Sequence, residues 1–138
     1  MKAEFEITDD ILIVKLSGEV DHHGTAKIRD EIDSTYRVFG SRHMILDFSA
    51  VSFIDSSGIG MIMGRYNKVQ ETGGRMQICG CSEYMRSILL MSGIFTIVRE
   101  CGSVQEGIRL LRNDEEESGA GTEKEEKSEN SGGMKNEK

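Results

Sequence analysis

The sequence predicts an α/β fold built on a mixed sheet, with an antiparallel hairpin at the N-terminus and about four helices. Near the start of the chain, two apolar strand patterns flank Asp9 and Asp10, a dipeptide suited to a tight turn. Beyond this hairpin, strand-like and helix-like apolar patterns alternate up to about residue 112. Such alternation is typical of a sheet covered by helices.

The first elements follow from local patterns. Phe5 and Ile7 fall in the first strand, and residues 11–16 form the second. Asp21 stands where it can cap the following helix, and Gly40 can end that helix. The apolar side chains of this helix recur at helical spacing, and they are Ile28, Ile32, Tyr36 and Phe39.

The later elements continue the alternation. A continuous apolar run predicts a covered strand over 43–48, and the helix after Ser57 ends at Gly73 and Gly74. Gly93 closes a later helix in the same way. The remaining predicted elements are a strand over 75–79, a helix over 82–92, a short strand over 95–98 and a last helix over 103–112.

Charge divides the chain into a domain and a tail. Residues 1–112 carry 15 acidic and 13 basic side chains, whereas residues 113–138 carry 9 acidic and 4 basic ones. The second segment has Met134 as its one large apolar residue, so the sequence predicts an acidic, disordered tail. An acidic chain is also a poor candidate for nucleic-acid binding.

The N-terminal charges, the short apolar runs and the cysteine content predict a cytoplasmic protein. Charges within the first seven residues argue against a signal peptide, and the apolar runs are too short to span a membrane. The three cysteines, Cys79, Cys81 and Cys101, form an odd set without secretory features. We therefore expect buried thiols and no membrane partner.

The segment from Val51 to Tyr66 is the strongest candidate for a functional site. An apolar strand leads into Asp55, Ser56 and Ser57, and a glycine-spaced helix follows. A hydroxyl at a helix start lies beside unpaired N–H groups and the positive end of the helix dipole, which favour an added phosphate. Serine is also a common helix cap, and the residues alone favour capping over phosphorylation.

The helix after Ser57 has two glycines in its interior. Its predicted sheet-facing stripe is Ile59, Ile62, Met63, Tyr66 and Val69, with Gly60, Met61, Gly64, Arg65 and Lys68 on the other side. Each interior glycine costs about 1 kcal/mol of helix propensity relative to alanine. Either a loop of the same chain packs closely there, or the glycines and Met61 form a surface for a partner.

Three other chemistries are weak alternatives. A serine hydrolase could use Ser56, because His22 and His23 follow the second strand and can reach the same sheet edge, but the first glycine of the nucleophile elbow is missing. The glycines from Gly58 onward lack the lysine of a Walker motif. The cysteines match no standard zinc spacing, so no metal is expected.

Four segments together resemble one family. They are residues 17–23, 53–66, 73–76 and 91–95, in the right order and spacing. With them the chain resembles the STAS-domain anti-sigma factor antagonists, and most of all those that control sporulation. The resemblance covers about residues 1–111, which makes 1–112 a STAS domain, and the tail over 113–138 has no counterpart in it.

The resemblance implies a phosphorylation switch in transcription control. Ser56 would be phosphorylated by an anti-sigma factor that is also a serine kinase, while Ser57 would cap the helix. Asp21 would lie at the partner-facing edge near Ser56. The implied partner surface comprises Asp21, Asp55, Ser57, Gly58, Gly60, Met61 and Gly64.

On this interpretation the chain is a binding protein and a kinase substrate, without catalytic activity or a cofactor of its own. Unphosphorylated, it would bind the anti-sigma factor and release the sigma factor. A PPM-type serine phosphatase would reverse the phosphorylation. The alternatives are a general-stress antagonist of the same family and a small nucleotide-binding or hydrolytic enzyme.

Overall fold

The computed structural model describes the backbone of residues 1–124 and the side chains of residues 1–115. The chain divides into two compact units, with the division after Gly107. The first unit contains the whole sheet and three helices. The domain boundary predicted at residue 112 is a few residues later than this division and falls inside the last helix.

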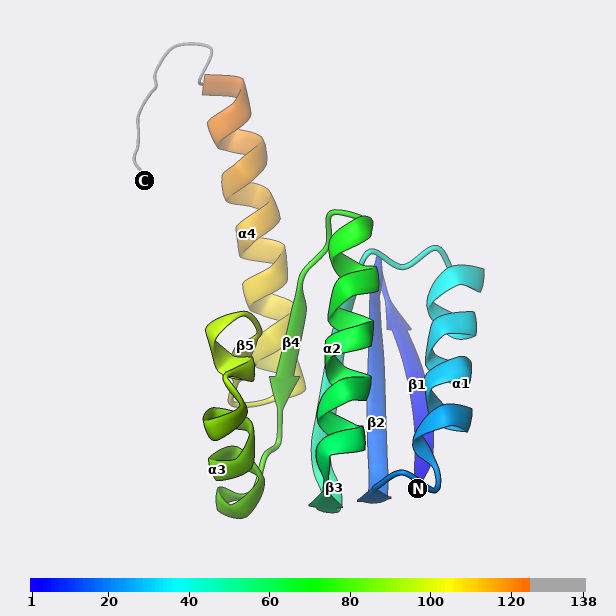
Figure 1. Cartoon of the computed structure of the whole chain (residues 1–138). Coiled ribbons are helices and arrows are strands. Elements are labelled where there is room, and N and C mark those ends of the chain that lie inside the picture. The colour runs from blue at the N-terminus through cyan, green and yellow to red at the C-terminus, as the bar shows by residue number, and fades with distance from the viewer. Residues whose placement is uncertain (125–138) are drawn as a thin grey trace. The chain divides into compact units, whose positions relative to one another are not determined.

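A five-stranded mixed sheet in the order β1-β2-β3-β4-β5 forms the centre of the first unit (Figure 1). The first two strands are antiparallel and turn at Asp9, whose φ is 55°, while all later pairings are parallel. The predicted hairpin and mixed sheet are therefore confirmed. The strands are β1 (Lys2–Thr8), β2 (Ile11–Val20), β3 (His43–Ile54), β4 (Met76–Cys79) and β5 (Arg99–Cys101).

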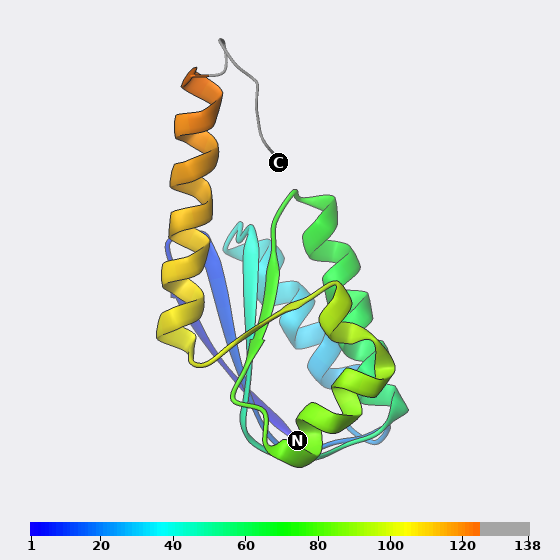
Figure 2. The same cartoon turned by 90° about the vertical axis from the view of Figure 1, so that its left-hand side faces the viewer.

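Three helices pack on one face of this sheet: α1 (Thr25–Val38), α2 (Ser56–Glu71) and α3 (Glu83–Ser92) (Figure 2). Strand side chains of alternating positions meet the apolar side chains of the helices in one core. Full burial of one large aliphatic side chain stabilises a fold by about 1.5–3 kcal/mol. The fully buried members include Leu12, Val14, Leu16, Ile32, Leu46, Ile62, Met85 and Leu89.

Two predictions about local structure are wrong. Phe39 was expected within the helix, on its apolar stripe, but it is 62% exposed because α1 has ended at Val38. The strand expected over 95–98 is instead a 3₁₀ turn, η1 (Ile94–Thr96), followed by β5. Gly93, at φ 83°, turns the chain so that Ile94 enters the core, and two i to i+3 hydrogen bonds close the turn.

The last helix, α4 (Val104–Lys124), continues past residue 112, where the sequence predicted its end. Its continuation covers 113–124, the first part of the predicted disordered tail. The acidic run after Asn113 consists largely of glutamate, which has a good helix propensity. The remainder of the tail prediction, 125–138, lies outside the described residues.

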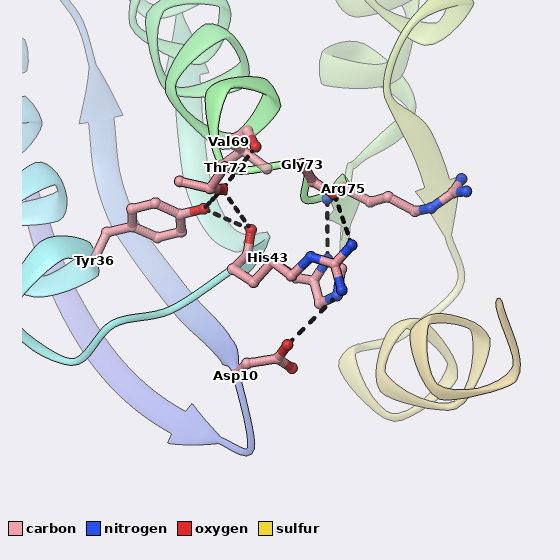
Figure 3. Close-up of polar contacts among 8 residues, drawn as sticks. Asp10, Tyr36, His43, Val69, Thr72, Gly73 and Arg75 are labelled. Atoms are coloured by element: carbon pink, nitrogen blue, oxygen red, sulfur yellow. Dashed lines mark hydrogen bonds and ion pairs between the residues drawn. The ribbon is translucent and has the colours of Figure 1, made fainter. Parts of the chain in front are cut away.

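A dense polar network holds the amino ends of the parallel strands (Figure 3). The Tyr36 hydroxyl donates to the carbonyl oxygen of Arg42 at 2.5 Å and lies 2.7 Å from the Thr72 hydroxyl. The His43 ring, which is buried, accepts the backbone N–H of Arg75 through Nδ1 at 3.0 Å. These bonds join α1, β3, α2 and the start of β4.

Backbone contacts tighten the same end. The carbonyl oxygen of Asp10 accepts the N–H groups of Arg42 and His43 at 2.7 and 3.0 Å, which ties the hairpin turn to β3. Gly74 packs so closely that a Cβ there would lie 1.7 Å from the carbonyl oxygen of Arg42. Only glycine fits at this position, because a backbone oxygen cannot move aside as a flexible side chain can.

Candidate regulatory site

Asp55 links the carboxyl end of β3 to the first turn of α2. Its backbone is extended, with φ −120° and ψ −169°, as is usual for a helix cap. One carboxylate oxygen, Oδ1, accepts the N–H groups of Ser57 at 2.9 Å and Gly58 at 3.3 Å. Two of the N–H groups that a helix start leaves unpaired are thereby satisfied.

The two caps predicted from the sequence are both wrong. Ser57 does not cap α2, because the helix already begins at Ser56 and Asp55 occupies the capping position. Asp21 does not cap α1, which begins at Thr25 after Gly24 and has no side-chain cap. Asp21 instead accepts the N–H of His23 at 3.1 Å and shapes the loop before the helix.

Of the two adjacent serines at the start of α2, Ser56 is exposed and Ser57 is half-buried. The hydroxyl of Ser56 makes no hydrogen bond within the described part of the chain. Gly58 allows the helix to start this close to the sheet, because a Cβ there would lie 2.5 Å from Ile54 and 2.9 Å from Val20. The first turn therefore presents one hydroxyl to solvent from a tightly packed base.

The loop between β2 and α1 lies beside this turn, as the sequence predicted for its two histidines. The N–H of Asp55 donates to the carbonyl oxygen of Val20 at 3.3 Å, which joins the two strand ends. Nδ1 of His22 lies 3.8 Å from Oδ2 of Asp55, the carboxylate oxygen that is not used for capping. The rings of His22 and His23 are in contact, with centroids 4.1 Å apart and planes tilted by 36°.

The buried face of α2 differs from the predicted stripe. Met61, expected on the partner surface, is 4% exposed and belongs to the core, so its assignment as a partner contact is wrong. Arg65, expected at the surface, is also buried, with its Nε 2.8 Å from Oδ1 of Asp33 on α1. Ile59, Met63 and Tyr66 are only partly buried against the core.

The ion pair between Arg65 and Asp33 accounts for the burial of this face of α2. The Arg65 side chain extends from α2 to α1, where Asp33 offsets its charge. Its Nε and Nη1 atoms form no well-aligned hydrogen bond. Burial lowers the pKa of the Arg65 guanidinium, and Asp33 opposes that effect. Hydrophobic periodicity treats arginine as a surface residue, so it could not find this arrangement.

The two interior glycines of α2 have open surroundings. A Cβ built at Gly60 or Gly64 would meet nothing within 4 Å. The interpretation that a loop of the same chain packs against them is therefore wrong for the described residues. Their place in a partner surface stays a prediction.

Comparison with known proteins identifies the family. The model of the STAS domain matches residues 2–107. The anti-sigma F factor antagonist of Paenibacillus polymyxa is 37% identical over 98 residues, which cover 71% of this chain and 84% of that protein. The chain belongs to the STAS-domain anti-sigma factor antagonists. The predicted family and fold are thus confirmed.

Solved structures agree with this antagonist fold. The anti-sigma factor antagonist SpoIIAA in its unphosphorylated form matches with a TM-score of 0.65 and 27% identity, covering 80% of this chain and 98% of that one. The phosphorylated form of Bacillus SpoIIAA matches with a TM-score of 0.64 and 28% identity, covering 80% and 99%. The candidate site around Asp55 and Ser56 lies inside the matched domain.

The antagonist shows no arrangement for hydrolysis at Ser56. Within the described residues, no hydrogen bond joins this serine to either histidine, and His22 faces Asp55 instead. One oxygen of Asp55 is also occupied by the helix cap. A catalytic serine needs a base within hydrogen-bond reach, so the geometry gives the hydrolase alternative no support.

The three thiols of the antagonist have raised pKa values. Cys79 and Cys101 are buried, as predicted, and Cys81 is half-buried. Burial raises the pKa of the Cys79 thiol to about 12 and those of Cys81 and Cys101 to about 11. The thiols therefore stay protonated at neutral pH.

Among the described helices, none is both long and apolar enough to cross a membrane.

Proposed function

We propose that phosphorylation of Ser56 switches this antagonist off. Unphosphorylated, it binds an anti-sigma factor that is also a serine kinase, and the sigma factor is released for transcription. The observation that carries this proposal is the division of roles between Asp55 and Ser56. Asp55 caps the helix, so the Ser56 hydroxyl is exposed and makes no hydrogen bond within the described residues.

The surroundings of Ser56 also suit an added phosphate. It would stand at the amino end of the 16-residue helix α2, where the positive end of the dipole favours an anion by about 0.3–1 kcal/mol. The fold therefore has no reason to rearrange. A solved phosphorylated form of SpoIIAA, a structural relative, supports the same reading.

The switch would act by exclusion at the interface. The proposed partner surface keeps Asp21, Asp55 and Ser57 around the phosphate, and Gly60 and Gly64 along the open side of α2. Gly58 belongs to the same turn, although it is buried beneath the surface. A phosphate adds about −1.5 to −2 charges and considerable bulk, which a close interface cannot accommodate.

The remaining parts of the cycle follow from this role. The kinase supplies the nucleotide and the metal ion, so the antagonist needs no cofactor and performs no catalysis. A PPM-type serine phosphatase restores the binding form. Because sigma factors act with RNA polymerase, the antagonist would work in the cytoplasm, and the anti-sigma F relatives favour a role in sporulation.

The test uses the full-length protein with the kinase-type anti-sigma factor of the same organism and Mg-ATP. Mass spectrometry should locate the phosphate on Ser56, and Ser56→Ala should abolish labelling. Ser57→Ala is the matched control, since it removes the neighbouring hydroxyl without touching the Asp55 cap, and it should still be labelled. Phosphate on Ser57, or equal labelling of Ser56→Ala and wild type, would refute the assignment.

A further inference from the structure

Two histidines beside Ser56 have no role in the proposed switch. They lie in the loop between β2 and α1, and Nδ1 of His22 is 3.8 Å from Oδ2 of Asp55. This distance is too long for a hydrogen bond but short enough for electrostatic attraction. The His22 side chain is 68% exposed, so its ring can turn toward a new group at the start of α2.

A phosphate on Ser56 would create an electrostatic problem that these histidines can offset. The neighbouring carboxylate of Asp55 cannot turn away, because its Oδ1 is held by two N–H groups of α2. A phosphate with about two negative charges on the next residue would therefore stand near a fixed negative charge. A cation between the two groups removes much of the repulsion.

We propose that His22 binds the phosphate of phosphorylated Ser56, as a positioning residue that keeps the group at the start of α2. The imidazole would donate one N–H to a phosphate oxygen while remaining beside Asp55. A charge-assisted contact of this type needs about 2.7–2.9 Å between the heavy atoms. The inference rests on Ser56 being the modified residue.

The loop holds His22 in place for this contact. Asp21 accepts the N–H of His23 at 3.1 Å, and the carbonyl oxygen of Asp21 accepts the N–H groups of Gly24 and Thr25 at 3.3 Å. The backbone on either side of His22 is thereby fixed. The tilted ring of His23, 4.1 Å away between centroids, supports one side of the His22 ring.

The titratable groups around the phosphate would thus be Asp55 on the same turn, and Asp21, His22 and His23 on the facing loop. His22 is the histidine that approaches the carboxylate of Asp55, whereas His23 bonds to Asp21 through its backbone N–H and touches His22 through its ring. The proposal therefore separates two adjacent residues of one chemical type. This makes His23 a matched control.

The experiment incorporates phosphoserine genetically at position 56 of the full-length chain, so that no kinase is required. ³¹P NMR then follows the second ionisation of the phosphate, whose pKa is usually about 6. His22→Gln should raise that pKa by about 0.3–0.7 units, the size expected for an exposed ion pair. His23→Gln should change it by less than half as much.

A second measurement needs no substitution. The ¹⁵N shifts of the His22 ring should differ between the phosphorylated and unphosphorylated proteins, with a smaller change at His23. An equal effect of the two substitutions, or no effect of either, would overturn the proposal. Because the phosphate is installed without the kinase, this result stands apart from the test of which serine the kinase modifies.

Discussion

The two ends of the parallel strands differ in how their polar groups are used. At the amino end, Tyr36 and His43 are buried and bond to backbone groups of neighbouring elements. At the carboxyl end, Ser56 and His22 are exposed, and the side chains of Asp55 and Asp21 bond to backbone N–H groups of their own turns. Figure 3 shows the amino end, and the carboxyl ends of β2 and β3 lie at the bottom of Figure 1.

This difference separates stability from function. Polar groups that are buried and bonded hold elements together, and losing one partner costs the desolvation of the other. Exposed groups at the carboxyl ends contribute little to stability and can therefore change their charge or partner freely. In open α/β sheets the carboxyl ends of the strands are also where ligands usually bind. Four predictions test this separation.

The largest expected effect is at the amino end. Gly74→Ala places a Cβ 1.7 Å from the carbonyl oxygen of Arg42, and the backbone must move to relieve the overlap. We expect a loss of about 3 kcal/mol or more in the free energy of unfolding, measured by urea denaturation. Gly60→Ala is the control, because its Cβ meets nothing within 4 Å. The free energy of unfolding of Gly60→Ala should rise by about 0.5–1 kcal/mol. A decrease would contradict the open surroundings of Gly60.

The second effect is at the carboxyl end and concerns binding. Ser56→Asp places a negative charge where the phosphate is proposed, so affinity for the anti-sigma factor should fall about a hundredfold, or roughly 2.8 kcal/mol. Its melting temperature should stay within about 3 °C of the wild type. Calorimetric titration and thermal unfolding measure the two quantities. Cooperative destabilisation together with unchanged affinity would reverse the roles of the two ends.

The third effect depends on pH. Tyr36→Phe removes the bonds to Arg42 and Thr72 and should cost about 1–2 kcal/mol at pH 8. Burial raises the pKa of Tyr36 above its usual 10.0, so the neutral hydroxyl is the form that stabilises the fold. This contribution is complete below pH 10 and is lost as the pH rises through the raised pKa. Urea denaturation should therefore show the wild-type advantage shrinking at strongly alkaline pH, while a constant difference would argue against the buried hydroxyl.

The smallest effect concerns the cap of α2. Asp55→Ala removes the bonds to Ser57 and Gly58 and should cost about 1 kcal/mol of stability. Asp55→Ser retains a capping oxygen and should recover most of that loss. Ser57→Ala should change stability by less than about 0.5 kcal/mol, because Ser57 does not cap the helix. A larger loss in Ser57→Ala than in Asp55→Ala would contradict the assignment of the cap.

The error in the predicted cap of α2 came from the position of one boundary. The sequence predicted a covered strand over 43–48 and an apolar strand leading into Asp55, and the structure joins them into β3, whose last residues pair with Glu19 and Val20 of β2. The helix then begins immediately after Asp55, which takes the capping position that had been given to Ser57. Strand pairing between distant residues sets this boundary, and local propensity contains no information about it.

By itself the sequence determined the features that depend on neighbouring residues. The turn at Asp9 and the left-handed glycine at Gly93 are local, and so is the exposed serine after an apolar strand. Tertiary structure alone decided that Arg65 is buried beside Asp33, and that His22 approaches Asp55. Both are contacts between residues more than 30 positions apart, and their geometry exists only after the helices and strand ends have packed together.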